Sequence, residues 1–517
     1  MPEDKAYNGI FRKKNLDRMI SDVESGTNHL KRVLSAFDLT ILGIGAIIGA
    51  GIFTLAGTAA AGSEGHVGAG PGLVLSFVLA GILCALTALC YAEFASMIPV
   101  AGSSYTYTYT TMGEFVAWMM GWTLLLGLGI GNIAIVCGWS GYLFELMRGY
   151  QTFLHLPDWL VNPPLWLSFD YYTALGMYQS TGVQPDFPTI LGIPISVNLP
   201  AVFIVIVTTI LLYIGIQESA KVATAMVLLK LAVIIFFIGF GAFYIAPENW
   251  VPFMPNGFPG VAIGAFLVTF AYVGFDIIST TAEETKNPSK DLPIGIIASL
   301  IICTVIYILV AAVLTGMEPW NQIDTHAPIA AAMNHIGKNW VAGIISIGAV
   351  IGLFSVILVQ LLGLSRIIFA ISRDGLLPKL FSKVHHKYKT PHVATVFTGI
   401  VTIIGTLFFD INKSAELANI GVLSAFAIVC LGIIILRKTD PERKRPFKVP
   451  FSPLIPALGV LLNLFLILYT FFNPTSPLTY TLIFYCGWTF AGLLIYIGYG
   501  SKHSVLKAEL EAKYKEN

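Results

Sequence analysis

The sequence predicts an all-α integral membrane protein with twelve transmembrane helices. Of its 517 residues, 56% are apolar and only 11% are charged, whereas soluble domains average about 25% charged residues. Sliding-window hydropathy finds twelve stretches near the length of about 20 apolar residues that a bilayer core requires. Lys and Arg concentrate in alternate connecting segments, as the positive-inside rule requires. These observations exclude a soluble enzyme, a disordered chain and a disulfide scaffold, and a net charge of +1 gives no basic field for nucleic acid.

The twelve predicted spans follow one another with short connections. They begin near Phe37, Gly72, Phe115, Leu199, Val222, Gly260, Ile294, Trp340, Val393, Leu417, Leu454 and Leu478. The third span is expected to run to about Met147. The following stretch, 148–197, holds six prolines, and we expect an ordered extracellular loop there.

The distribution of basic residues orients these spans. With both termini inside, all but four of the 30 Lys and Arg residues lie in inner segments. The exceptions are Arg148, Lys338 and Lys413 on the outer side and Lys230 within the fifth span. We therefore expect a multi-pass protein of the plasma or bacterial inner membrane, with residues 1–36 and 500–517 in the cytoplasm.

Metal, cofactor and enzyme chemistry have no candidate residues. The six cysteines lack CxxC spacing, and the nine histidines fall in polar loops or tails. There is no His/Cys/Asp cluster and no nucleotide-binding P-loop. We expect no metal, no cofactor and no enzymatic activity.

Span one contains four glycines in nine residues, Gly43, Gly45, Gly49 and Gly51. Each destabilises a helix by roughly 1 kcal/mol relative to alanine. One interpretation is close helix packing, because Gly45 and Gly49 form a GxxxG pair. The other is a helix that unwinds in mid-membrane, which a bilayer tolerates only where the backbone lines a cavity.

Span six has a matching weak point at Phe270–Asp276, centred on Gly274. Spans one and six are five helices apart, and an odd offset reverses direction, so spans 1–5 and 6–10 can form an inverted repeat. Interrupted segments at matching positions are the sequence indication of a midplane transporter site. Free N–H groups at Ala50–Gly51 suit a carboxylate, and free carbonyls near Ile47, Phe270 and Val273 suit an ammonium group. The predicted ligand is an α-amino acid, and the segments Ile47–Gly51 and Phe270–Gly274 supply the candidate substrate-binding residues Ile47, Gly49, Ala50, Gly51, Phe270, Ala271, Val273 and Gly274.

Four further motifs stand out within residues 34–436: GAIIGAGIF, YAEFASMIPVAGSSYTY, FAYVGFDIISTTAEETKNPSKDLP and RIIFAISRDGLLP. They resemble the motifs of the amino acid–polyamine–organocation (APC) superfamily. The chain is similar to the cationic amino acid transporter branch of that superfamily and its bacterial relatives. The resemblance implies a LeuT-type fold with five-helix repeats at 37–245 and 258–437, two extra helices at 438–499, and spans one and six broken. It also implies substrate binding by the backbone of Ile47, Ala50, Gly51, Phe270 and Val273, with Phe270 as an aromatic lid.

Lys230 lies about ten residues from either end of span five, too deep for easy snorkelling. One interpretation is a structural tether to helix carbonyls. The other is a proton-coupling residue whose charged form holds span five to span one near Gly43–Ile44 and whose neutral form releases it. A lysine at this place in similar proton-coupled members supports proton symport. Sodium coupling, for which span eight offers only Ser355 as an obvious hydroxyl ligand, and exchange without net ion coupling remain alternatives.

The residues that select the substrate side chain are less clearly marked. Close relatives often carry glutamate where Gly127 stands, so a neutral substrate is favoured over a cationic one. Asp276 follows the break in span six and is assigned a structural or gating role before a role in recognition. Asn132, Val359 and Gln360 are weaker candidates for the pocket lining.

Together these residues predict a secondary active transporter that imports small or medium neutral L-amino acids by proton symport with alternating access. The partners are therefore an amino acid, a proton and the lipid bilayer; whether a small membrane protein also associates is left open. A cationic amino acid transporter and an exchanger are the alternatives, followed by a membrane amino acid sensor.

Overall fold

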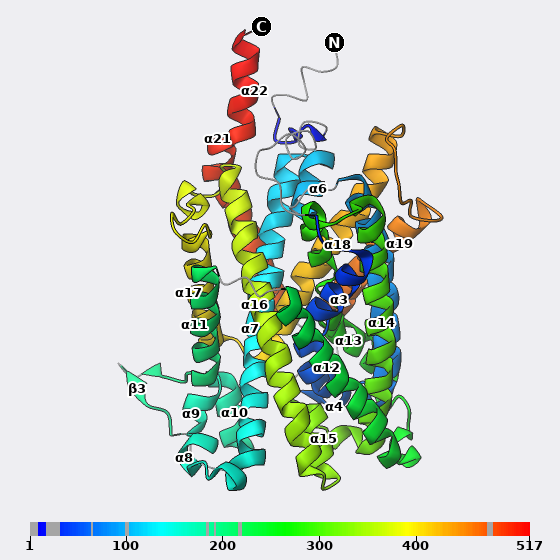
Figure 1. The fold of residues 1–517 in the computed structure, drawn as a ribbon, viewed down its shortest axis with the longest axis vertical. Helices are drawn as coiled ribbons and strands as arrows, with labels where there is room; N and C mark the ends of the chain where they lie inside the picture. The colour runs from blue at the N-terminus through cyan, green and yellow to red at the C-terminus, as the bar shows by residue number, and fades with distance from the viewer. Residues whose placement is uncertain are drawn as a thin grey trace.

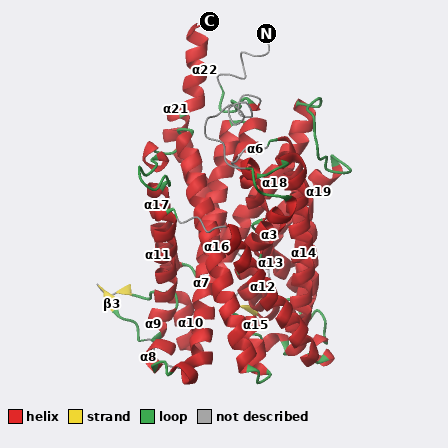
Figure 2. Cartoon of the chain, in the orientation of Figure 1, coloured by secondary structure: helices red, strands yellow, loops and turns green. Residues whose placement is uncertain are grey.

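The computed structural model describes residues 9–16, 32–63, 66–98, 103–181, 186–190, 193–215, 220–472 and 479–516. It is a bundle of long helices that run side by side along one axis (Figures 1 and 2). Among these residues, nine helices are long and apolar enough to cross a membrane, or ten if one bent pair counts as a single span. Two shorter apolar helices, Leu199–Ile214 and His392–Phe408, accompany them.

The first half of the bundle contains one interrupted helix, the three long helices α5, α7 and α12, the shorter helix α11, and several short elements between α7 and α11. The bounds are α3 (Ala36–Ile47), the π-helix η1 (Gly51–Leu55), α4 (Ala56–Ala61), β1 (Gly62–Ser63), β2 (His66–Val67), η2 (Gly70–Gly72), α5 (Leu73–Met97), α6 (Ser103–Thr111), α7 (Glu114–Leu154), α8 (Asp158–Val161), α9 (Leu165–Ser168), α10 (Tyr171–Thr181), β3 (Thr189–Ile190), β4 (Ile193–Pro194), α11 (Leu199–Ile214), α12 (Ala220–Gly241), η3 (Ala242–Tyr244) and η4 (Pro247–Trp250). The strands form two small antiparallel hairpins, β1–β2 and β3–β4.

The second half begins with another interrupted helix. The bounds are α13 (Gly257–Thr269), η5 (Phe270–Tyr272), η6 (Phe275–Glu284), α14 (Pro288–Met317), η7 (Trp320–Gln322), α15 (Pro328–His335), α16 (Asn339–Arg373), η8 (Lys379–Ser382), α17 (His392–Phe408), α18 (Ile411–Thr439), α19 (Leu454–Phe472), α20 (Thr479–Ile495), the π-helix η9 (Tyr496–Gly500), α21 (Ser501–His503) and α22 (Val505–Glu516).

Helix ends differ from the predicted spans where polar first or last turns extend the apolar part. α18 begins at Ile411 rather than near Leu417, because Asp410 caps it by accepting the Lys413 N–H at 2.8 Å. α7 continues beyond Met147 to Leu154, into the segment expected to be loop. The predicted start of the last span at Leu478 lies outside the described residues.

Burial places the two interrupted helices at the centre of the bundle. The segment Gly257–Ala282 is almost wholly enclosed by protein, whereas Leu454–Phe472 and Tyr480–Ala512 are mostly exposed. α3 packs on α14 and α12, and α7 packs on both α16 and α18. α3 and α13 accordingly lie in the middle of the view, and α19 lies at its right edge (Figure 1).

Candidate functional site

The first interruption lies where the glycine-rich part of span one predicts it. α3 ends at Ile47, Ile48 is extended (φ −73°, ψ 98°), and the chain resumes at Gly51 with a 44° change of axis. The N–H groups of Ile52 and Phe53 both donate to the Gly49 carbonyl at 3.3 Å. Because the first N–H groups of a helix have no partner one turn back, we expect those around Ala50 and Gly51 to be available to a ligand.

The second interruption lies between η5 and η6. Val273 is extended (ψ 130°), and Gly274 has φ 130°, which a side chain rarely permits. A Cβ on Gly274 would lie 2.7 Å from the carbonyl carbon and oxygen of Ala46. The backbone of one broken helix therefore packs directly on that of the other.

Gly51, which follows the first break, also packs directly on the backbone of the other broken helix. A Cβ at this position would overlap the backbone of Ala271. Gly49, by contrast, faces Val356 of α16, with 3.4 Å between that side chain and a Cβ built on the glycine. The interpretation of these glycines as close-packing residues and the interpretation as a break thus both hold.

Tyr307 of α14 connects the two breaks. Its hydroxyl lies 2.9 Å from the carbonyl oxygen of Ile47 and 2.8 Å from that of Ala271. The expectation of a free Ile47 carbonyl is therefore wrong, and the Phe270 carbonyl already accepts the Val273 N–H at 3.2 Å. A carbonyl oxygen has two lone pairs, so each can still accept a second hydrogen bond.

Lys230 of α12 is fully buried against span one. Its ammonium group donates to the carbonyl oxygens of Gly45 and of Ile48, the latter at 3.0 Å. The contact predicted near Gly43–Ile44 lies slightly further along span one, at the adjacent Gly45 and at Ile48. In a continuous helix the Ile48 carbonyl would bond to Ile52, but that N–H turns to Gly49, so the break itself frees an acceptor for the lysine.

Comparisons with known proteins identify the family of this chain. The family model described as amino acid permease matches residues 34–496, which include both breaks, Lys230 and Tyr307. The chain belongs to the amino acid permease family. It is thereby a member of the APC superfamily, and its apolar helices make this permease a multi-pass membrane protein.

Its relatives include transporters of different substrates. The branched-chain amino acid permease BcaP of Bacillus subtilis is 46% identical over 96% of this chain and 99% of its own length. The methylthioribose transporter of the same bacterium is 42% identical over the same shares of the two chains. The vacuolar cationic amino acid transporter 4 of Arabidopsis thaliana is 34% identical over 84% of this chain and 68% of its own.

The remaining predicted residues of the permease lie either beside the two breaks or on α16. Phe270 is buried, and its ring lies 3.0 Å from a Cβ built on Gly131 of α7, beside the buried Asn132. Asp276 is buried in the first turn of η6, directly after the break. Ser355 donates to the Gly352 carbonyl of its own helix at 2.8 Å, so its hydroxyl is already used, and Val359 is only partly buried.

Two polar residues at the breaks were missed in the sequence. Tyr307 is one, and Asn419 of α18 is the other, since its amide nitrogen donates to the carbonyls of Phe266 and Leu267 at 2.7 and 3.2 Å. Those carbonyls belong to the last turn of α13, where the regular helical hydrogen bonds end, and the Leu267 carbonyl also accepts the Phe270 N–H. Both residues could have been noticed in the sequence, because each is a polar side chain in the middle of an apolar span. Such side chains in membrane helices usually serve a function or contact another helix.

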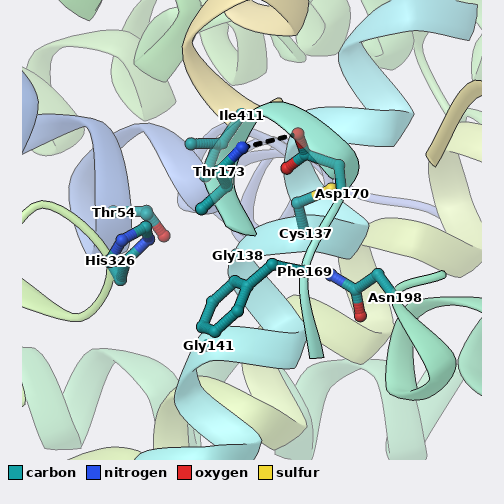
Figure 3. A pocket seen from close by; sticks show the side chains of 10 residues that line it. All are labelled: Thr54, Cys137, Gly138, Gly141, Phe169, Asp170, Thr173, Asn198, His326 and Ile411. Atoms are coloured by element: carbon teal, nitrogen blue, oxygen red, sulfur yellow. Dashed lines mark hydrogen bonds between the residues drawn. The ribbon is translucent and has the colours of Figure 1, made fainter. Parts of the chain in front are cut away.

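A pocket lies beside η1, which follows the first break, and encloses about 320 Å³ of free space, part of it open to solvent. Figure 3 shows Thr54 and His326 on one side of it and Asp170 on the other. Asp170 accepts the N–H groups of Tyr172 and Thr173 at 3.0 and 3.1 Å, and burial raises the pKa of its carboxyl. Thr54 lies in η1, so this pocket adjoins the part of the broken helix that follows the break. The full lining is Thr54, Cys137, Gly138, Gly141, Phe169, Asp170, Thr173, Asn198, His326 and Ile411.

At the opposite end of the permease, the buried carboxylate of Glu114 at the start of α7 collects four donors. The Arg12 guanidinium donates to it at 2.9 Å, and the hydroxyls of Tyr109 and Tyr496 do so at 2.7 and 3.1 Å. The Ser504 hydroxyl is the fourth donor. We call this group the Glu114 junction; it joins the segment around residue 12, α6, α7 and the last helices.

Proposed function

We propose that this protein is a secondary active transporter that imports small or medium neutral L-amino acids by proton symport with alternating access. The observation that carries the proposal is the meeting of two broken helices, Gly51 on Ala271 and Gly274 on Ala46, with a lysine on the freed carbonyls. Backbone groups released at mid-membrane suit a zwitterion, with helix N–H groups for its carboxylate and carbonyls for its ammonium group.

We further propose the twelve-span arrangement of two inverted five-helix repeats, 37–245 and 258–437, followed by two helices in 438–499. Helices five positions apart in that scheme pack on each other: α5 on α14, α7 on α16 and α11 on α17. The two broken helices form the first such pair. A rocking motion of one repeat against the other around the breaks is the expected transport step.

Proton coupling is assigned to Lys230. A buried amine binds the carbonyls of Gly45 and Ile48 strongly when charged and weakly when neutral. Loss of the proton therefore weakens the link between α12 and the first break. Exchange without a coupling ion remains the alternative, in which Lys230 is a permanent tether.

A neutral substrate is supported by the packing at Gly127. A Cβ there would lie 2.9 Å from the Val422 side chain, and one on Gly421 would lie 2.8 Å from the Gly127 nitrogen. The helices α7 and α18 thus touch through their backbones at the place where a carboxylate would be needed. The named relatives support both a branched-chain and a cationic substrate, so cationic transport is the alternative.

The proposed location is the cell membrane, with both termini in the cytoplasm. The test is uptake by the purified full chain in proteoliposomes, with a panel of labelled neutral and cationic amino acids. Accumulation of a neutral amino acid that requires an inward proton gradient is expected. Equal uptake with and without the gradient would favour exchange, and uptake of lysine or arginine alone would favour the cationic alternative.

A further inference from the structure

The long helices α7 and α16 form one wall beside the breaks, and their register is fixed by two contacts. Gly129 faces Leu364, whose Cδ2 lies 3.7 Å from a Cβ built on the glycine. Nearly three turns further along α7, the Trp139 indole N–H donates to the Val350 carbonyl at 3.0 Å. Because the helices run antiparallel between these contacts, Asn132 lies level with Gln360.

Both amides at this level are buried and short of partners. Asn132 is 0% exposed and Gln360 is 4% exposed. In the part of the chain that the structure describes, neither polar atom of the Asn132 side chain has a hydrogen-bond partner, nor has Oε1 of Gln360. Buried polar atoms almost always have partners. Asn419 and Asn463, also buried among helices, each donate through their amide nitrogen.

The same two residues border the breaks. On α16, Val356 precedes Gln360 by one turn on the same face and packs on Gly49. On α7, Gly131 precedes Asn132 and faces the ring of Phe270. A ligand held by the backbone at the breaks would therefore extend its side chain toward these amides.

We infer that Asn132 and Gln360 form the polar end of the substrate site and recognise a hydroxyl or amide group on the side chain of a small neutral amino acid. This inference rests on the proposed amino acid transport and names the substrate class within it. A hydroxyl can donate to one amide oxygen and accept from one amide nitrogen, whereas a methyl group in its place leaves both unpaired. A site built in this way discriminates against the analogue that lacks the polar group.

Threonine and valine make the sharpest test because they have nearly the same shape. In proteoliposomes containing the full chain, we expect threonine to be taken up with at least about tenfold higher kcat/KM than valine, the effect of one hydrogen bond. Asn132→Leu and Gln360→Met should each bring this ratio toward one by slowing threonine while valine uptake persists. The matched control is Ser365→Ala on α16, which should keep the wild-type ratio. Its hydroxyl donates to the Leu362 carbonyl of its own helix at 2.9 Å.

Equal uptake of threonine and valine by the wild type, or an unchanged ratio in both amide variants, overturns the inference while amino acid transport stands. Failure of the wild type to take up any amino acid overturns the proposed function and the inference with it. If one of the two variants fails to elute as a folded protein in size-exclusion chromatography, the threonine-to-valine ratio of the wild type and of the other variant still tests the inference.

Discussion

The ammonium group of Lys230 lies 3.0 Å from the carbonyl oxygen of Ile48, the residue at which span one leaves the helical path. Lys230→Ala removes the group that bonds at the break. We expect gradient-driven accumulation of substrate to be lost, whereas exchange of labelled for unlabelled substrate continues. Proteoliposome uptake with and without an inward proton gradient measures both.

The control is Lys290→Ala, which removes an exposed lysine before the seventh predicted span and should leave accumulation unchanged. Wild-type pumping by Lys230→Ala would remove the coupling role and leave the fold as described.

Tyr307→Phe removes only the hydroxyl that connects the Ile47 and Ala271 carbonyls. A buried carbonyl that loses its partner costs about 1–3 kcal/mol. We expect the kcat/KM for uptake to fall about tenfold or more, which corresponds to about 1.4 kcal/mol. Initial-rate uptake measures the effect, and Tyr480→Phe, at a residue 55% exposed, is the control. Unchanged kinetics in Tyr307→Phe would mean that the breaks do not need this bridge.

Gly274→Ala places a methyl group 2.7 Å from the backbone of Ala46 at a φ of 130°. Overpacking of this kind costs about 1–3 kcal/mol, and strained backbone adds a similar amount. We expect a clear fall in the Tm of the purified protein and loss of uptake. Gly363→Ala in α16 has nothing within 4 Å of the added atom and should keep or slightly raise the Tm. A Gly274→Ala protein with normal Tm and uptake would contradict the direct packing of the two breaks.

Glu318, just after α14, should make stability depend on pH. Burial raises the pKa of its carboxyl to about 7, from 4.5 in an unfolded chain, and Asp324 adds to the shift. Between pH 4.5 and 7 the folded protein therefore holds a proton that the unfolded chain has lost, so stability falls as pH rises through this range and levels off above it. The His335 ring, 3.6 Å away, favours the charged carboxylate when protonated and reduces the slope.

Glu318→Gln should flatten this part of the profile of Tm against pH, measured from pH 5 to 8. Glu248→Gln, at an exposed residue of η4, should retain the wild-type slope. A wild-type Tm that rises from pH 5 to 7, with the same slope in Glu318→Gln, would show that other groups control this range.

Local sequence was sufficient for the breaks but not for their long-range partners. The glycines around Gly49 and Gly274 weaken their helices through backbone entropy, a property that each residue carries in any context, so both interruptions could be predicted. The partners of Lys230 were placed slightly too early in span one because helix register against α12 depends on packing, in particular of Val227 on Gly45. Tyr307 and Asn419 were missed because a single polar residue in an apolar span does not reveal which distant carbonyl it reaches.

The Glu114 junction has a mechanical consequence. One carboxylate holds side chains from the segment around Arg12 and from the helices around Tyr496 and Ser504. A rotation of α7 must therefore either carry the segment around Arg12 and the last helices along or break the hydrogen bonds that Arg12, Tyr496 and Ser504 donate to Glu114. If the proposed rocking motion turns α7, fluorescent dyes placed near Arg12 and Ser504 would report that motion without any label near the ligand.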